Sequence, residues 1–218
     1  MRPKTARRSS QGVDSRQRIL DATFKLACEL GYTATSIGKV STKSGLPASS
    51  IYWHFGNKDA LFVAVIEDSF EKWWSTSSTR FTPAEADVVP QAISEHIHSL
   101  VDNIVSNTDF WRLGLLLTLE KHPDEPAARR RFEEIRAMVQ EKLSLFWLKA
   151  LDPDMNESKR LKSSRVLARF TMICADGLFV SSEAEGAEGM QELAEIISSA
   201  LVREIRCLND PDRYGLSS

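Results

Sequence analysis

The chain is poor in cysteine and has no long hydrophobic run. Cys28, Cys174 and Cys207 are its cysteines. They lie far apart without a C-x-x-C spacing, which argues against a disulfide framework and a zinc site, so we expect three buried thiols. No stretch of about 18 apolar residues is present, and no apolar segment follows the basic start. The sequence therefore predicts neither a membrane span nor a secretory signal, and a cytoplasmic protein.

Charge is unevenly distributed, although the formal net charge is only −2. Residues 1–60 contain 10 Lys+Arg and 4 Asp+Glu, a net +6, and residues 61–218 contain 18 and 26, a net −8, which together give −2. The start, MRPKTARRSSQG, lacks apolar periodicity, so we expect a disordered basic arm over residues 1–13. This arm is either a solvated terminus without a role or a segment that binds an anionic partner.

Strand-like alternation and internal repeats are both missing. Apolar residues after residue 13 recur instead at the three- and four-residue steps of an α-helix, which predicts an all-α fold of about nine helices. The first covers residues 14–30 and ends at Gly31, and the last five cover about 90–107, 109–121, 125–150, 157–183 and 187–208. The polar stretch STSSTRFTPAEADVV, over residues 75–89, is the clearest loop.

Two short helices joined by a tight turn are predicted after the first helix. Thr35 or Ser36 caps the first of the pair and Gly45 stops it, while Pro47 lies near the first turn of the second. This helix-turn-helix and the first helix make a three-helix domain over residues 14–60. Asn57 then caps a longer helix, which connects this domain to the rest of the chain over residues 61–75.

The second short helix contains three adjacent rings, those of Tyr52, Trp53 and His54. A helix this short has one narrow inward face, so three neighbouring rings cannot all point at a core. Ile51 and Phe55 are four residues apart and are the better candidates for that inward face. The sequence therefore predicts that Tyr52 and Trp53 are exposed.

The outward side of this helix has the chemistry of a DNA-binding surface. Small residues at its start allow close approach to the major groove, where Ala can contact a thymine methyl group and Ser can hydrogen-bond a base edge. Hydroxyl, ring and ammonium groups can position the helix on phosphate oxygens. The candidates are Ala48 and Ser49 for bases, and Ser50, Tyr52, Trp53, His54 and Lys58 for the DNA backbone.

Residues 16–65 resemble the tetracycline-repressor (TetR) type of transcription regulator. The motifs at the family's spacing are Gly31-Tyr32, Thr35-Ser36, Gly45-Leu46, Ile51-Tyr52-Trp53-His54-Phe55, and Asn57-Lys58-Asp59 with Leu61. The resemblance implies that the second short helix is the recognition helix, with the base and phosphate roles given above. It also implies that Ser36, at the start of the first short helix, contacts the DNA backbone.

The sequence departs from this family pattern at several positions. Ser41 and Ser44 stand where the family usually has Ala, and Ser49 stands where Gly is frequent. Ile37 and Gly38 occupy positions where some members place Thr and Arg for DNA contacts. We therefore expect few side chains to read bases, and we expect basic residues of the arm to add phosphate or minor-groove contacts. These residues are Arg2, Lys4, Arg7 and Arg8.

The resemblance also implies a ligand-binding and dimerisation domain over residues 76–208, followed by a tail over residues 209–218. Ligand sites in helical domains are mostly apolar with a few polar groups. Aromatic residues at helical spacing nevertheless fill cores more often than they line pockets. The pocket candidates are Trp74, Trp111, Leu115, Met138, Trp147 and Phe170.

The last two helices carry more apolar surface than one neighbour can cover. Two such helix pairs related by a two-fold axis would close a four-helix bundle, which predicts a homodimer. The alternative is a hairpin that packs only within its own chain. The interface candidates are Phe170, Ile173, Gly177, Val180, Ile197, Leu201 and Ile205.

Sites for chemistry or metals have little support. His96 and His98 are two residues apart, so a helix points them in different directions. No nucleophile, phosphate loop or carboxylate pair can be assembled, and we expect no cofactor, no metal and no enzymatic activity. The expected protein is a homodimeric repressor that binds a double-stranded DNA operator and is released by a small organic effector. An activator, a regulator controlled by a protein partner, and an enzyme with an incidental helix-turn-helix are the alternatives.

Overall fold

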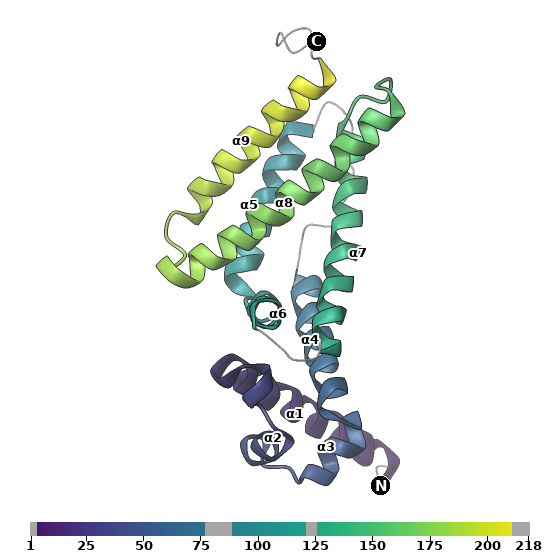
Figure 1. Cartoon of the computed structure of the whole chain (residues 1–218), viewed down its shortest axis with the longest axis vertical. Helices are drawn as coiled ribbons and strands as arrows, with labels where there is room; N and C mark the ends of the chain where they lie inside the picture. The colour runs from purple at the N-terminus through teal and green to yellow at the C-terminus, as the bar shows by residue number, and fades with distance from the viewer. Residues whose placement is uncertain (1–3, 77–88, 121–125, 211–218) are drawn as a thin grey trace. The chain divides into compact units, whose positions relative to one another are not determined.

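The computed structural model describes residues 4–76, 89–120 and 126–210, with side chains from Val13 onward except that of Val89. Within these ranges the chain forms nine helices and no strand (Figure 1), which confirms the all-α prediction. The helices are α1 (Lys4–Ala34), α2 (Ile37–Ser44), α3 (Ala48–Phe55), α4 (Lys58–Thr76), α5 (Val89–Ser106), α6 (Asp109–Leu119), α7 (Ala127–Ala150), α8 (Glu157–Glu185) and α9 (Met190–Asn209). No described helix is long and apolar enough to cross a membrane.

Helix α1 begins at Lys4, so the prediction of a disordered arm over residues 1–13 is wrong for residues 4–13. Lys, Ala, Arg and Gln in this segment are good helix formers, and lengthening an existing helix needs no new nucleus. The side chains of the predicted arm contacts, Arg2, Lys4, Arg7 and Arg8, lie outside the described part of the chain. So do residues 77–88 of the predicted loop and 211–218 of the predicted tail.

Local capping chemistry sets the boundaries of the helix-turn-helix. Ser36 is the N-cap of α2, and its hydroxyl oxygen accepts the backbone N–H of Lys39. Gly45 ends α2 with a φ of 68°, in the left-handed region that glycine adopts without a steric penalty. Asn57 caps α4 through a 2.8 Å hydrogen bond from the backbone N–H of Ala60. The predicted caps at Gly45 and Asn57 are therefore confirmed.

The first compact unit comprises Met1–Trp74 and Asp109–Glu134. Helix α1 packs on α2, α3 and α6, and the core contains Ile19, Leu20, Val40, Ile51, Leu61 and Phe62. Aromatic rings join α4 to α6, since the ring centroids of Trp73 and Phe110 are 5.6 Å apart. The break after Trp74 lies one residue from the expected boundary between residues 75 and 76, but Asp109–Glu134, expected in the second domain, belongs to the first unit.

The second compact unit comprises Ser75–Thr108 and Ile135–Ser218. Helix α5 packs on α9 and α8, and α8 also contacts α9. Burial of Ile93, Ile97, Leu143, Phe146 and Trp147 makes the core of this unit. Cys174 and Cys207 are half-buried in this unit and Cys28 is half-buried in the first, so the prediction of buried thiols is wrong.

Candidate DNA-binding surface

Helix α3 presents two large rings to solvent. Ile51 is 1% exposed, whereas Tyr52 and Trp53 are 53% and 79% exposed. The three residues before Ile51, Ala48, Ser49 and Ser50, are half-buried or exposed. The exposure of Tyr52 and Trp53 confirms the prediction made from the three adjacent rings. Helix α3 buries Ile51 and exposes its opposite side to solvent. Phe55 is only half-buried. The guanidinium of Arg16 covers its ring, and Cζ of Arg16 lies 5.6 Å from the ring centroid of Phe55.

His54 faces α1 and not the open side of α3. Its Nε2 lies 3.0 Å from the hydroxyl oxygen of Ser15. Burial lowers the pKa of His54, and the neighbouring Arg16 lowers it further. This arrangement gives His54 a role in holding α3 on α1, and it differs from the phosphate contact that the sequence predicted.

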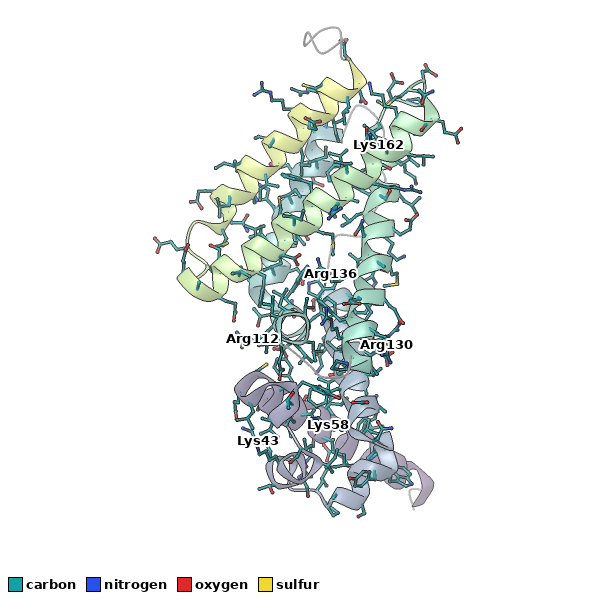
Figure 2. The ribbon with its side chains drawn as sticks, in the orientation of Figure 1. Lys43, Lys58, Arg112, Arg130, Arg136 and Lys162 are labelled. Carbon is teal, nitrogen blue, oxygen red and sulfur yellow. The ribbon has the colours of Figure 1, made fainter. Side chains whose placement is uncertain are left out.

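Lys58, labelled in Figure 2, begins α4 and lies beside the end of α1. Its Nζ is 4.2 Å from the ring centroid of Tyr32 and donates to the backbone oxygen of Thr33 at 3.3 Å. Burial lowers the pKa of Lys58, although the carboxylates of Asp59 and Glu120 oppose this shift. The ammonium group therefore uses one of its three N–H donors on the backbone of the first unit, a contact that the sequence did not predict.

The start of α2 adds further polar groups to the helix-turn-helix. Ser36 is exposed, as a backbone contact to DNA requires, but its hydroxyl also serves as the α2 cap. Two lysines of α2 were not among the predicted contacts: Lys39 donates to the backbone oxygen of Ala34 at 2.8 Å, and Lys43 (Figure 2) forms a 2.7 Å ion pair with Glu29. Both ammonium groups thus have partners within the first unit.

The six pocket candidates are divided between the two units. Trp74, Trp111 and Leu115 belong to the first, where Trp111 is 2% exposed and packs edge-on against Trp73. Met138, Trp147 and Phe170 belong to the second. Trp147 is fully buried and its ring N–H donates to the hydroxyl of Thr171 at 3.2 Å. This contact is core packing of the second unit.

Two of the candidates are open to solvent. Met138 is 41% exposed and Phe170 is 43% exposed. Phe170 lines a groove of about 600 Å³ between α8 and α9, together with Val166 and Leu201. Nearby polar groups on α7 and α8 are paired, since Arg136 (Figure 2) donates to both carboxylate oxygens of Asp176 at 2.7 Å. Within the second unit, the three candidates therefore occupy different environments.

Helix α8 has an unbroken row of exposed apolar side chains. Val166, Phe170, Ile173 and Val180 are 60%, 43%, 58% and 55% exposed, and Gly177 in the same row is exposed too. On α9, Ile197 is half-buried. Leu201 and Ile205 were also predicted at the interface, but they are 2% and 3% exposed. These two residues face the core of their own unit, so they offer no free surface to a second copy.

Fold and surface together define an all-helical protein with an N-terminal helix-turn-helix domain. Residues 19–65 match the family model described as bacterial regulatory proteins, tetR family. The chain therefore carries the DNA-binding domain of the TetR family.

Curated relatives agree with this assignment. The regulator AcrR of Shigella flexneri is 36% identical over 63 residues, and the repressor NicS of Pseudomonas putida is 28% identical over 136 residues. These matches cover 28% and 62% of this chain, and the chain spans 29% of the length of AcrR and 61% of the length of NicS.

Solved structures of low sequence identity share the fold over most of the chain. A transcriptional regulator from Rhodococcus sp. RHA1 superposes with a TM-score of 0.65 at 14% identity, covering 87% of this chain and 96% of that one. SmeT, solved as a complex with triclosan, superposes with a TM-score of 0.58 at 18% identity, covering 86% and 91% of the two chains.

Proposed function

We propose that this protein is a ligand-responsive transcriptional repressor: a homodimer binds a palindromic operator, and a small organic effector releases it. The observation that carries this proposal is the exposed side of α3, where Tyr52 and Trp53 remain open to solvent. Tyr52 and Trp53 are adjacent, and contiguous exposed apolar surface is typical of a binding site. A DNA regulator of this kind acts in the cytoplasm of a bacterium.

In this proposal α3 enters the major groove. Ala48 and Ser49 lie at its N-terminal end, where a recognition helix contacts base edges. Ser50, Tyr52 and Trp53 position the helix on the sugar-phosphate backbone, as do Ser36 at the start of α2 and Lys58 at the start of α4. His54 contributes by holding α3 on α1 through Ser15.

The exposed row on α8 supports a homodimer. Its members follow one another at steps of four and three residues, from Val166 to Val180, which is the spacing of a helix–helix seam. A two-fold axis through this row would give each half-site of a palindromic operator one recognition helix, and such half-sites lie about 34 to 36 Å apart. We assign the interface to Phe170, Ile173, Gly177, Val180 and Ile197.

Release by a small molecule has support from a structural neighbour. SmeT was solved with triclosan bound, and its fold covers most of this chain. An effector that binds better to a state with misplaced recognition helices would lower operator affinity by about 5- to 150-fold, for a coupling of roughly 1 to 3 kcal/mol. We retain Met138 and Phe170 as effector contacts of the second unit, with Trp147 as a buried support. Trp74 and Leu115 remain separate candidates of the first unit, where Trp111 is buried.

The test is a gel-shift assay with DNA upstream of the protein's own gene, and with fragments selected from genomic DNA, at about 150 mM salt with competitor DNA. Wild type should bind a fragment saturably, and Tyr52→Ala should weaken this binding by about tenfold or more, because it removes a phosphate-positioning group. Leu145→Ala is the matched control, since Leu145 is 52% exposed on α7. Equal loss in both variants, or no specific fragment for wild type, would contradict the proposal.

The effector is sought with the same assay. Compounds that release the wild-type complex are then titrated against Met138→Ala, because Met138 is exposed and is not assigned to the dimer interface. A shift of the release curve in this variant, with unchanged operator affinity in the absence of the compound, would assign Met138 to the effector site. Stimulation of transcription from the bound fragment, measured in a reporter assay, would favour an activator instead.

A further inference from the structure

Glu120 follows α6 and caps a turn at the end of α1. Its Oε2 accepts the backbone N–H of Tyr32 at 2.8 Å, and its Oε1 accepts the backbone N–H of Thr33 at 3.3 Å. The turn exists because Gly31 departs from helical geometry, with φ 77° and ψ 174°. Such a break deprives the next N–H groups of acceptors in the preceding turn, and a carboxylate is a strong replacement.

Gly31 also leaves room for this carboxylate. A Cβ atom at Gly31 would lie 3.0 Å from Oε2 and 3.1 Å from Oε1 of Glu120. The positive φ therefore favours glycine here, and a side chain at this position would also displace the carboxylate of Glu120. The turn is built around the anionic group of a residue 88 positions further along the chain.

The same turn contacts the DNA-binding elements. The backbone N–H of Thr35 donates to the oxygen of Tyr32 at 3.3 Å, immediately before the α2 cap. Lys58 donates to the oxygen of Thr33 and lies over the ring of Tyr32. Glu120 thus takes the N–H groups of the turn while Lys58 takes one of its carbonyl groups, and the two opposite charges hold the turn between them.

We infer that Glu120 is a positioning residue for DNA binding, acting through the Gly31 turn on Lys58. The inference rests on the proposed function, because Lys58 contributes to affinity only if DNA is the partner. When the carboxylate fixes Tyr32 and Thr33, the ammonium of Lys58 is held at the start of α4, where it is available to a phosphate. Loss of the carboxylate frees the turn, and Lys58 loses its fixed position.

The experiment measures affinity of the full chain for a genomic fragment that wild type selects, over a series of salt concentrations. The variants are Glu120→Ala, Lys58→Ala, their double variant, and Glu71→Ala. Glu71 is an exposed glutamate of α4, so its variant reports the effect of removing one negative charge. Each variant is first checked for wild-type thermal unfolding.

Glu120→Ala should lower affinity by about tenfold and should reduce the slope of log affinity against log salt by about one, as Lys58→Ala does. The double variant should bind no more weakly than the weaker single variant, because both remove the same phosphate contact. Glu71→Ala should neither lower the affinity nor reduce the slope of log affinity against log salt. Glu120→Gln keeps an oxygen acceptor for the Tyr32 N–H and should restore most of the affinity.

Two outcomes would overturn the positioning role. One is that the affinity losses of the single variants add in the double variant, as expected for a structural defect that acts independently of Lys58. The other is an unchanged salt slope in Glu120→Ala. If Glu120→Ala does not fold, the same comparison is made with Glu120→Gln. This variant should lose less DNA affinity, but the positioning role still requires that it cause no further loss when Lys58 is already replaced by Ala. Failure of wild type to bind any fragment is a separate result, and it would overturn the proposed function itself.

Discussion

Gly114 of α6 lies directly against the ring of Phe132 of α7. A Cβ atom at Gly114 would be 2.0 Å from Cε2 of Phe132, much closer than two carbon atoms can approach. Phe132 is 1% exposed and its ring centroid is 5.2 Å from that of Phe110, so it has no free direction in which to retreat. The backbone of α6 therefore forms one wall of the aromatic core of the first unit.

Gly114→Ala should accordingly destabilise the protein by about 1 to 3 kcal/mol through overpacking, which outweighs the roughly 1 kcal/mol by which Ala is the better helix former. Gly38→Ala is the control, because Gly38 is an exposed residue of α2 with only the Ser36 hydroxyl, 3.8 Å away, near its Cβ position. It should leave stability unchanged or raise it slightly. Urea unfolding measures both, and equal stability of the two variants would contradict the close contact.

Burial of His96 predicts a pH-dependent stability. Its ring stacks on Phe146 at 4.8 Å between centroids, and burial lowers the pKa of His96 from 6.5 to about 4. Between these values the unfolded chain binds the proton and the folded chain does not, so stability rises with pH. The contribution is fully present above about pH 6.5 and is lost as pH falls to about 4, in total about 3 kcal/mol.

The measurement compares urea unfolding of wild type and His96→Phe from pH 7 to pH 4.5. The variant keeps an aromatic ring beside Phe146 but cannot take up a proton, so its stability should fall less steeply over this range. Carboxylates titrate in both proteins and cancel in the difference. Parallel stability curves would mean that His96 does not carry the pH dependence.

Local chemistry explains why much of the fold was predictable. Gly45 and Asn57 act on the backbone within a few residues, and Asn156 caps α8 of the second unit in the same way, by accepting the backbone N–H of Lys159. Burial of Ile51 with exposure of Trp53 followed from the geometry of one short helix. These features need no knowledge of the rest of the chain.

Packing between distant segments was not predictable in this way. Apolar periodicity shows that a helix has a buried face, but not which helix covers that face, so Leu201 was assigned to a dimer interface although its own unit buries it. Hydrogen bonds between a side chain and a distant backbone group could not be predicted either. Nothing in the sequence around Glu120 predicts that its carboxylate accepts the backbone N–H of Tyr32. The contact of His54 with Ser15 on α1 was equally unpredictable, because the two residues are 39 positions apart in the chain.

Trp53 offers a test of the DNA-binding surface that leaves the fold intact. Because its side chain is 79% exposed, Trp53→Ala should not change thermal unfolding. Under the proposed function it should weaken operator binding by about tenfold, since the ring would supply contact area and an N–H donor to the DNA backbone. Trp53→Phe keeps most of the contact area but loses the N–H donor, so its operator affinity should lie between those of wild type and Trp53→Ala. Wild-type affinity in Trp53→Ala would place the DNA outside this part of α3.

Ile173 and Leu201 distinguish the proposed dimer interface from the core. Ile173 is 58% exposed in the middle of the α8 row, so Ile173→Glu should give a folded monomer, because two carboxylates would meet near the two-fold axis. Leu201 is 2% exposed, and Leu201→Glu should instead unfold the second unit, since it buries an unpaired charge.

Analytical ultracentrifugation and circular dichroism separate these outcomes. Leu145→Glu is the control, because Leu145 is 52% exposed on α7 and is not a member of the α8 row, and it should remain a folded dimer. The monomeric Ile173→Glu should also lose most operator affinity, since one recognition helix contacts only one half-site. A dimeric Ile173→Glu would show that α8 is not the interface, and the exposed row would then have to be covered by another partner.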